Sequence, residues 1–307
     1  LTWELVSVGG GDTFVRLCEA PEPQGPNPSG VARGVLLRQL FSVASLLGAD
    51  ARDPLVLAQL RLVLLTLDKI IENPSTSSLL LQIDLGGNLP LWRLAAARAT
   101  EFTLPSPQPL LAAAYTLLCD ALAQNQRRAT FSPDLYLHAL TVLHRLLLLQ
   151  HRAAQTLPLM RWAMLWEALN STAAFIAQEE IIMLPRAPEA AMRLLQVINL
   201  LISTGDRLFP SVAIFESFAY ELVRQHRTFD LLYRLGKKHA PQLTSALRLA
   251  RSMIVQALER LGQLGDQAAS VRPPPFQTSF QTSFQTSFQT PLPDPPSRPP
   301  FHTPLLD

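Results

Sequence analysis

Three histidines, His138, His144 and His151, lie in one apolar stretch, and imidazole is the commonest protein ligand of transition metals. They are six and seven residues apart, whereas two imidazoles on a helix share a metal ion at i, i+4 spacing. His144 and His151 would share a helix face but lie about 10 Å apart along its axis. The spacing therefore predicts polar-face or hydrogen-bonded histidines and no metal site.

Other residue patterns with known chemistry are also incomplete. Glu179 and Glu180 would point about 100° apart on a helix, so they do not make an acid/base pair by themselves. The glycines of 9–11 lack the Gly-Lys-Ser/Thr ending of a phosphate-binding loop and favour a flexible turn. No nucleophile elbow, dinucleotide fingerprint or Cys/His nucleophile signature is present. The sequence predicts no catalytic residue, no metal and no cofactor, and hence a protein that is not an enzyme.

Cys18 and Cys119 are the two cysteines of the 307-residue chain. They are too few to staple a domain of this size and have no metal-ligand spacing, so we expect buried thiols in a reducing cytosol. No stretch reaches the roughly 18 uncharged apolar residues of a membrane-spanning helix. Because the chain starts at Leu1 without a basic segment, we interpret it as a piece of a longer protein and not as a signal peptide.

Four cations recur on one side of a helix expected over about 211–238. At about 100° per residue, Arg224, Arg227, Arg234 and Lys238 fall within about 80° of arc, opposite an apolar face rich in Phe and Tyr. Two interpretations stay open. The pattern favours a merely solvated face, and the alternative is a contact surface for an acidic peptide or an anionic membrane.

A short motif near the C-terminus fits the ligand of an SH3 groove. Leu292 to Arg298 has the hydrophobic-Pro-x-hydrophobic-Pro-x-Arg pattern, in which Pro293 and Pro296 would dock as a polyproline strand and Arg298 would pair with acids. Chance matches are common in so proline-rich a segment, so this is a candidate only.

The elements that would position these residues are helices arranged around 132–151. Ser132 is a good N-cap, Pro133 suits the first helical position, and the leucines of this stretch cover about half of the helix surface. A helix this apolar is buried between neighbours. Regular caps and breaks predict helices over about 31–47, 54–72, 75–83, 106–126, 132–151, 156–178, 188–204, 211–238 and 241–262, with 84–105 as a long connection anchored by Trp92.

Helices of this length joined by short loops favour antiparallel neighbours, so the fold class is all-α, an armadillo- or HEAT-like α-solenoid. We expect three regions: an irregular Pro/Gly-rich segment over 1–30, the helical domain over 31–265, and a disordered Pro-rich tail with Phe-Gln-Thr-Ser repeats over 266–307. The net charge of +2 divides into −3, +6 and −1 over these regions. A mildly basic domain lacks the dense Lys/Arg patch of a nucleic-acid binder.

Four runs of residues carry a resemblance to a known family, and their order and spacing hold over about 100 residues. They are Asp134-Leu135-Tyr136 with Val142-Leu143-His144-Arg145-Leu146-Leu147, then Trp162-x-x-Leu165-Trp166-x-Ala168-Leu169, then Asn199-Leu200-Leu201-Ile202-Ser203-Thr204-Gly205-Asp206-x-x-x-Pro210, and finally Tyr220-Glu221-x-x-Arg224-x-His226-x-x-Phe229-Asp230-x-Leu232-Tyr233. The chain thereby resembles the C-terminal domain of the armadillo-like helical domain-containing protein 3 family. The tail has no counterpart in the family pattern.

The resemblance implies a non-enzymatic scaffold, cytoplasmic and peripheral at the Golgi membrane. It further implies recruitment of an Arf guanine-nucleotide exchange factor, contact with phosphatidylinositol 4-kinase beta, and a role in Golgi maintenance and secretion. The alternative function is a lipid- or small-ligand-binding helical domain, which a deep apolar pocket would favour. A closed core with an exposed charged groove would favour the scaffold.

Several matching residues are expected to be structural. Gly205 is placed for a helix C-cap, and Trp162 and Trp166 for core packing. His226 and Asp230, at i, i+4, could join a polar network at a helix junction.

Overall fold

The computed structural model describes residues 34–49, 53–84, 89–95, 98–105, 107–126 and 132–270 of the chain. The chain divides into two units, Leu1–Glu259 and Arg260–Asp307, and residues 260–270 of the second unit are helical. Within the described ranges the fold is helical apart from one β-hairpin, which confirms the all-α class. None of the helices in these ranges combines the length and the apolar character needed to cross a membrane.

The helices and strands follow one another along the chain with short connections. They are α3 (Val35–Ala49), α4 (Pro54–Glu72), α5 (Pro74–Gln82), β1 (Leu91–Ala95), β2 (Arg98–Phe102), α6 (Leu110–Asn125), α7 (Pro133–Arg152), α8 (Trp162–Ile176), α9 (Glu179–Ile182), α10 (Ala187–Leu208), α11 (Val212–Arg224), α12 (His226–His239) and α13 (Gln242–Ser270).

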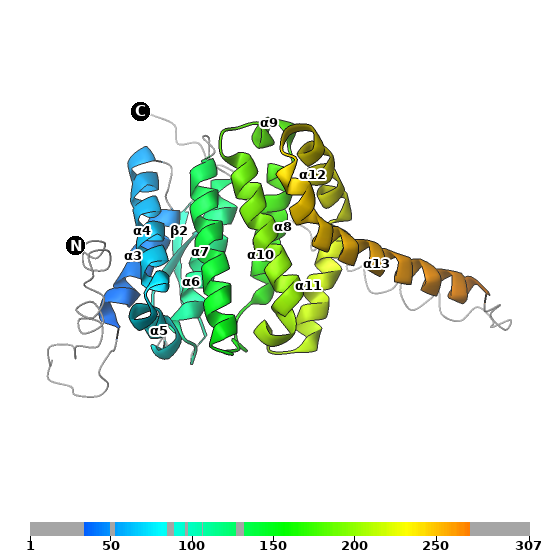
Figure 1. Ribbon diagram of the computed structural model, residues 1–307. Coiled ribbons are helices and arrows are strands. Elements are labelled where there is room, and N and C mark those ends of the chain that lie inside the picture. The colour runs from blue at the N-terminus through cyan, green and yellow to red at the C-terminus, as the bar shows by residue number, and fades with distance from the viewer. Residues whose placement is uncertain are drawn as a thin grey trace, which may run out of the picture. The chain divides into compact units, whose positions relative to one another are not determined.

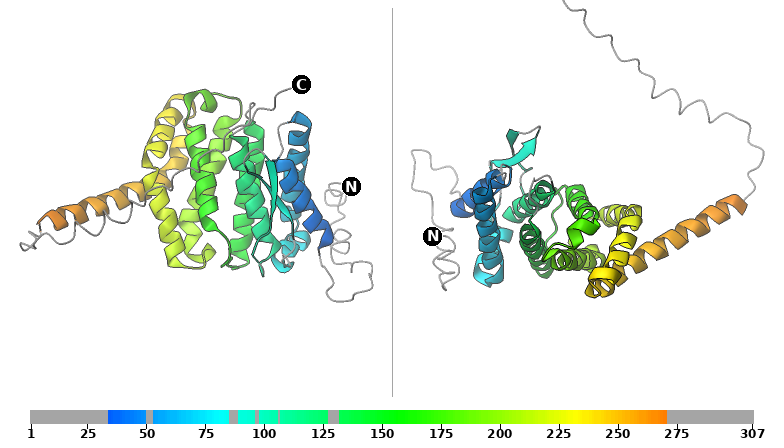
Figure 2. Two further views of the ribbon diagram at one scale, coloured as in Figure 1. Left: turned by 180° about the vertical axis from the view of Figure 1, so that it is seen from behind. Right: turned by 90° about the horizontal axis from the view of Figure 1, so that it is seen from above.

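The long helices of the first unit pack in two layers. Helices α4, α7 and α10 lie side by side in one layer (Figure 1), and α3, α6 and α8 form the second layer behind it (Figure 2). Successive helices alternate between the layers, so the pairs α3/α4, α6/α7 and α8/α10 stack one on the next. This is the arrangement of an armadillo-like solenoid, as the sequence predicted.

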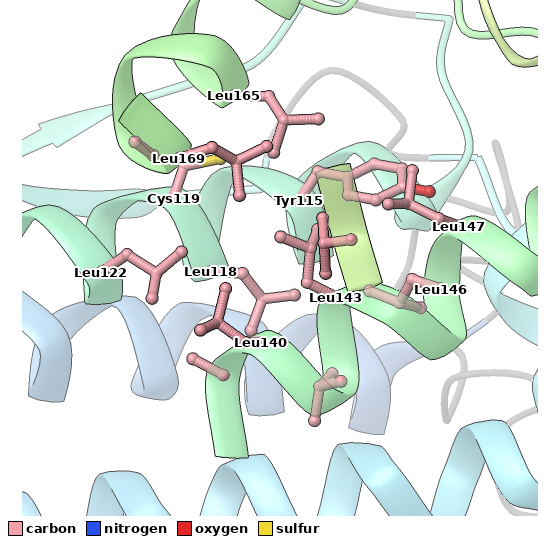
Figure 3. Packing of buried hydrophobic residues seen from close by; sticks show 14 of the residues in the cluster. Tyr115, Leu118, Cys119, Leu122, Leu140, Leu143, Leu146, Leu147, Leu165 and Leu169 are labelled. Carbon is pink, nitrogen blue, oxygen red and sulfur yellow. The ribbon is translucent and has the colours of Figure 1, made fainter. Parts of the chain in front are cut away.

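Helix α7 lies at the centre of the stack, which confirms the prediction for 132–151. It packs against α4, α6 and α10, and the Ser132 hydroxyl accepts a hydrogen bond from the Leu135 amide at its N-terminus. Figure 3 shows Leu140 and Leu143 of α7 beside Leu118 of α6, with Leu165 of α8 nearby. Each of these side chains is fully buried, so the three helices share one continuous core.

The connection over 84–105 contains an antiparallel hairpin that the sequence prediction lacked. Leu91 of β1 pairs with Phe102 of β2, and the hairpin packs on α3. Leu91 is the buried anchor, whereas Trp92 is only partly buried and donates its amide to the Ser45 hydroxyl. In strands this short, the alternation of apolar and polar residues covers too few positions to be distinguished from the helical pattern around them.

The single helix predicted over 211–238 is wrong, because the chain breaks at Gln225 into α11 and α12. Gln225 has φ −91° and ψ 15°, outside the helical range. The break lets α11 pack on α8 and α10 while α12 packs on α8 and α9. Non-helical backbone angles at one residue do not interrupt the spacing of apolar residues along the chain. The sequence pattern therefore does not reveal this break.

Other predicted helix bounds also differ. The helix expected over 156–178 begins at Trp162, because residues 153–161 form turns and irregular structure. Helix α10 continues through Gly205 to Leu208, so Gly205 is not a C-cap. Helix α13 continues past Gly262 to Ser270, so residues 266–270, assigned to the tail, are helical. The predictions for residues 1–30 and 271–307, including Cys18 and the motif of Pro293, Pro296 and Arg298, lie outside the described residues.

Candidate partner-binding surface

Helix α12 is amphipathic, with its charges opposite the core. Phe229, Leu232 and Leu235 are buried on one side. Four exposed residues, Arg227, Leu231, Arg234 and Lys238, recur at i, i+4, i+7 and i+11 and fall within about 60° of arc on the other side. We call these four residues the α12 basic face.

The helix break separates the four predicted cations into two groups. Arg224 is the last residue of α11, and its guanidinium lies 2.6 Å from the Glu221 carboxylate. Arg227, Arg234 and Lys238 remain together on α12. The predicted stripe therefore loses one member and gains Leu231, an apolar side chain between the cations.

The remaining cations differ in how they are paired. Lys238 forms an ion pair with Glu179 of α9, and His239 Nε2 lies 3.3 Å from the same carboxylate. Hydrogen bonds from Lys238 and His239 lower the pKa of Glu179. Arg227 and Arg234 have no carboxylate partner within ion-pair distance in the described part of the chain, so their charge is available to a ligand.

A groove beside α12 was missed by the sequence reasoning. It is lined by Tyr233 of α12 and by Thr244, Arg248, Arg251, Ser252 and Val255 of α13, and its volume is about 530 Å³. We call it the α13 groove. The recurrence of Thr244, Arg248 and Arg251 at i, i+4 and i+7 could have revealed one polar side of α13, but not the helix that closes the groove.

Arg251 is held in place at the edge of this groove. Its guanidinium lies 4.0 Å from the centre of the Tyr233 ring and 3.2 Å from the Asp230 carboxylate. Lys237 Nζ lies 4.8 Å from the same ring. Asp230 therefore pairs with Arg251 and not with His226, whose Nδ1 lies 3.1 Å from the Val223 carbonyl oxygen.

The charge balance of this surface is strongly positive. Residues 226–256 contain six Lys or Arg against a single acid, Asp230, which gives a formal charge of +5. Such a field attracts anionic partners and speeds their association.

His138, His144 and His151 lie on α7 and are not grouped for a metal ion. His138 and His144 are half-buried, and burial lowers the pKa of both side chains. No group of three His, Cys, Asp or Glu suited to a metal ion occurs among the described residues. Cys119 is buried, and burial raises the pKa of its thiol, which makes it unreactive.

The tryptophans serve packing, as predicted. Trp162 and Trp166 are each 3% exposed and stack with ring centres 5.9 Å apart. Phe209 packs edge-on against both rings, at 4.9 and 5.1 Å. This aromatic cluster fills the junction of α8 with the end of α10, and it leaves no face of either indole open to a ligand.

One partly enclosed pocket lies between the hairpin, α6 and the start of α8. Its volume is about 100 Å³, and Phe102, Leu104 and Met164 are among the residues that line it. Arg93 closes one side, where Nε lies 2.9 Å from the Asp120 carboxylate. The pocket is far smaller than the roughly 300–1,000 Å³ of typical small-ligand sites.

The two-layer fold and the exposed basic surface define an armadillo-like helical protein with a surface suited to anionic partners. Residues 108–264 match the family model of "Armadillo-like helical domain-containing protein 3, C-terminal", and the chain belongs to this family. The matched region runs from the start of α6 into α13 and includes both the α12 basic face and the α13 groove.

Curated relatives carry the same family name. The chain is 25% identical over 244 residues to Armadillo-like helical domain-containing protein 3 of Homo sapiens, an alignment covering 75% of this chain and 35% of the relative. It is 24% identical over 247 residues to the protein of that name from Danio rerio, covering 76% and 35%. The chain thus spans about a third of the length of these relatives. No solved structure matches it significantly.

Proposed function

We propose that this chain is a non-enzymatic interaction module that binds protein partners through the α12 basic face. The observation that supports this proposal is the pair of exposed arginines, Arg227 and Arg234, which lie opposite a closed core and lack a carboxylate partner among the described residues. Exposed charge without an internal partner contributes little to folding, so it is free to serve recognition.

Family membership suggests the setting of this interaction. We propose a cytoplasmic protein, peripheral at the Golgi membrane, that recruits an Arf guanine-nucleotide exchange factor and contacts phosphatidylinositol 4-kinase beta in support of Golgi maintenance and secretion. An anionic membrane surface would add to the attraction of the basic face, at about 1 kcal/mol for each cation near the lipid. The proposal involves neither a cofactor nor nucleic acid.

The alternative, a lipid- or small-ligand-binding domain, receives less support. The pocket of about 100 Å³ beside Arg93 is too small to hold an acyl chain. The α13 groove is larger, at about 530 Å³, but most of the side chains that line it are polar or charged. The buried leucines around α7 pack against one another and leave the core of the described region closed.

A charge-reversal pair tests the proposal in cells. The tagged full-length protein carrying Arg227→Glu and Arg234→Glu should recover much less phosphatidylinositol 4-kinase beta than wild type and should lose Golgi association. The matched control carries Arg152→Glu and Arg207→Glu, which change two exposed cations on the last turns of α7 and α10 by the same total charge.

The two double mutants distinguish recognition from net charge. If both double mutants lost partner recovery and Golgi association equally, overall charge alone would matter. If Arg227→Glu with Arg234→Glu lost neither, the α12 basic face would be only a solvated surface. Surface substitutions typically change stability by about 0.5 kcal/mol or less, so both proteins should fold.

A further inference from the structure

The α13 groove has dimensions that fit a short stretch of extended peptide. Its lining residues on α13 run from Thr244 to Gln256, which at 1.5 Å per residue spans about 18 Å. An extended chain advances about 3.3 Å per residue, so about five or six residues would fill this length.

The groove carries positive charge, and one of its cations, Arg251, is fixed in position. Arg251 is partly buried and held by Asp230 and the Tyr233 ring, so it would lose little side-chain freedom when it binds a ligand. Arg248 is exposed and has no carboxylate partner in the part of the chain that the structure describes. Lys237, Arg248 and Arg251 against Asp230 give a local charge of +2.

The other lining groups are suited to a polypeptide. The Thr244 and Ser252 hydroxyls and the Gln256 amide can both donate and accept hydrogen bonds, as an extended main chain requires. A membrane-bound helix instead presents an apolar face that enters the lipid. Leu243, Leu247 and Ile254 of α13 are buried in the core. The exposed large apolar residues of α13 among the described side chains, Leu249 and Val255, lie about 120° apart around the helix and do not make one apolar face.

We propose that the α13 groove binds an acidic segment of a protein partner in extended conformation. Its carboxylates would pair with Arg248 and Arg251, whose planar guanidinium groups can bind carboxylates through two hydrogen bonds. The proposal rests on the proposed interaction function and adds to it a second contact, separate from the α12 basic face, with a stated ligand chemistry.

Fluorescence anisotropy with the full-length protein tests this contact directly. The probe is a labelled peptide of alternating Asp and Glu long enough to fill the groove, and the control peptide alternates Asn and Gln. Arg248→Glu should weaken binding of the acidic peptide by about tenfold or more, because it replaces an attraction with a repulsion. Arg248→Lys, which keeps the charge, should bind more tightly than Arg248→Glu, and the neutral peptide should not bind.

Arg152→Glu is the matched control, since it makes the same change of charge at an exposed site in the last turn of α7, outside both the groove lining and the α12 basic face. It should alter peptide affinity by about twofold or less. An equal loss of peptide affinity in Arg152→Glu and Arg248→Glu would overturn the groove as the site, as would unchanged binding in Arg248→Glu. A melting curve for each variant confirms that it folds.

Vesicles of phosphatidylcholine with phosphatidylserine distinguish the peptide from a lipid surface. The proposal would be overturned in favour of a membrane contact by three results together. Wild type would bind these vesicles, Arg248→Glu would abolish that binding, and wild type would not bind the acidic peptide. The cell experiment on Arg227 and Arg234 gives its answer independently, so the groove and the proposed function can fail separately.

Discussion

At Gly205 the aromatic cluster packs directly against the backbone of α10. A Cβ atom there would lie 2.6 Å from Phe215 Cδ2 and 2.8 Å from Phe209 Cε2. Both rings pack against neighbouring aromatics, so neither can move away without disturbing the cluster. We therefore expect Gly205→Ala to destabilise the protein by about 1–3 kcal/mol, despite the better helix propensity of alanine.

Gly48 offers a matched control for this prediction. It also lies within a helix, but among the described residues no atom beyond its chain neighbours and its own helix backbone lies within 4 Å of its Cβ position. Gly48→Ala should therefore be neutral or stabilising by up to about 1 kcal/mol. Urea unfolding of both variants measures the difference, and a loss of similar size at both positions would contradict the role given to the rings.

His144 makes the stability of the protein sensitive to acid. Burial, with the charges of Arg193 and Arg145, lowers the pKa of His144 below its usual value of 6.5. The unfolded chain therefore binds the proton more tightly, so the stability contributed at neutral pH is lost as pH falls through 6.5 and the lower folded pKa.

His144→Gln should reduce this acid sensitivity. The fall in melting temperature from about pH 7.5 to about pH 5 should be smaller in the variant than in wild type, because one group no longer takes up a proton on unfolding. A fall as large as that of wild type would show that His144 does not contribute.

At the scale of elements, α6 depends on small residues. It lies between α3, α7 and α8, and Ala113 and Ala114 are fully buried. Ala113→Leu adds three carbon atoms to a closed core and should cost about 1–3 kcal/mol or more. Ala123→Leu, at a half-buried position of the same helix, should cost less. Thermal or urea unfolding compares the two, and equal costs would mean that α6 is less tightly enclosed than the structure indicates.

The long apolar elements could be predicted from the sequence, whereas their irregularities could not. Ser132-Pro133 marks the start of α7, and Asp53 and Asn73 cap α4 and α5 through hydrogen bonds to Leu55 and Ser75. The break at Gln225 depends on which helices α11 and α12 meet, and the hairpin depends on Leu91 reaching α3. Both are tertiary effects that periodicity within one segment does not contain.

The same distinction between patterns within one helix and contacts between helices applies to the candidate surface. The spacing of Arg227, Arg234 and Lys238 within one helix was visible in the sequence, and these three residues do share a face. The pairing of Lys238 with Glu179 and the contact of Tyr233 with Arg251 join residues from different helices. No pattern along one helix predicts such contacts, and they decide which charges remain free.

At the scale of the whole molecule, the described residues of the first unit form a helical stack, and residues 226–256 carry a formal charge of +5. The family match covers 108–264 and the chain spans about a third of its curated relatives, so partners proposed for the whole family need to be tested on this chain itself. Electrostatic recognition has a definite signature, because interactions between exposed charges weaken as salt screens them.

The affinity of the purified full-length protein for purified phosphatidylinositol 4-kinase beta is the measurement that tests the central claim most directly. We expect wild-type affinity to fall as salt rises from about 50 to about 300 mM, and Arg227→Glu with Arg234→Glu to weaken binding by about tenfold or more at physiological salt. The control with Arg152→Glu and Arg207→Glu should bind like wild type. An affinity that changed neither with salt concentration nor with the charge reversal on α12 would contradict the claim that this face recognises partners.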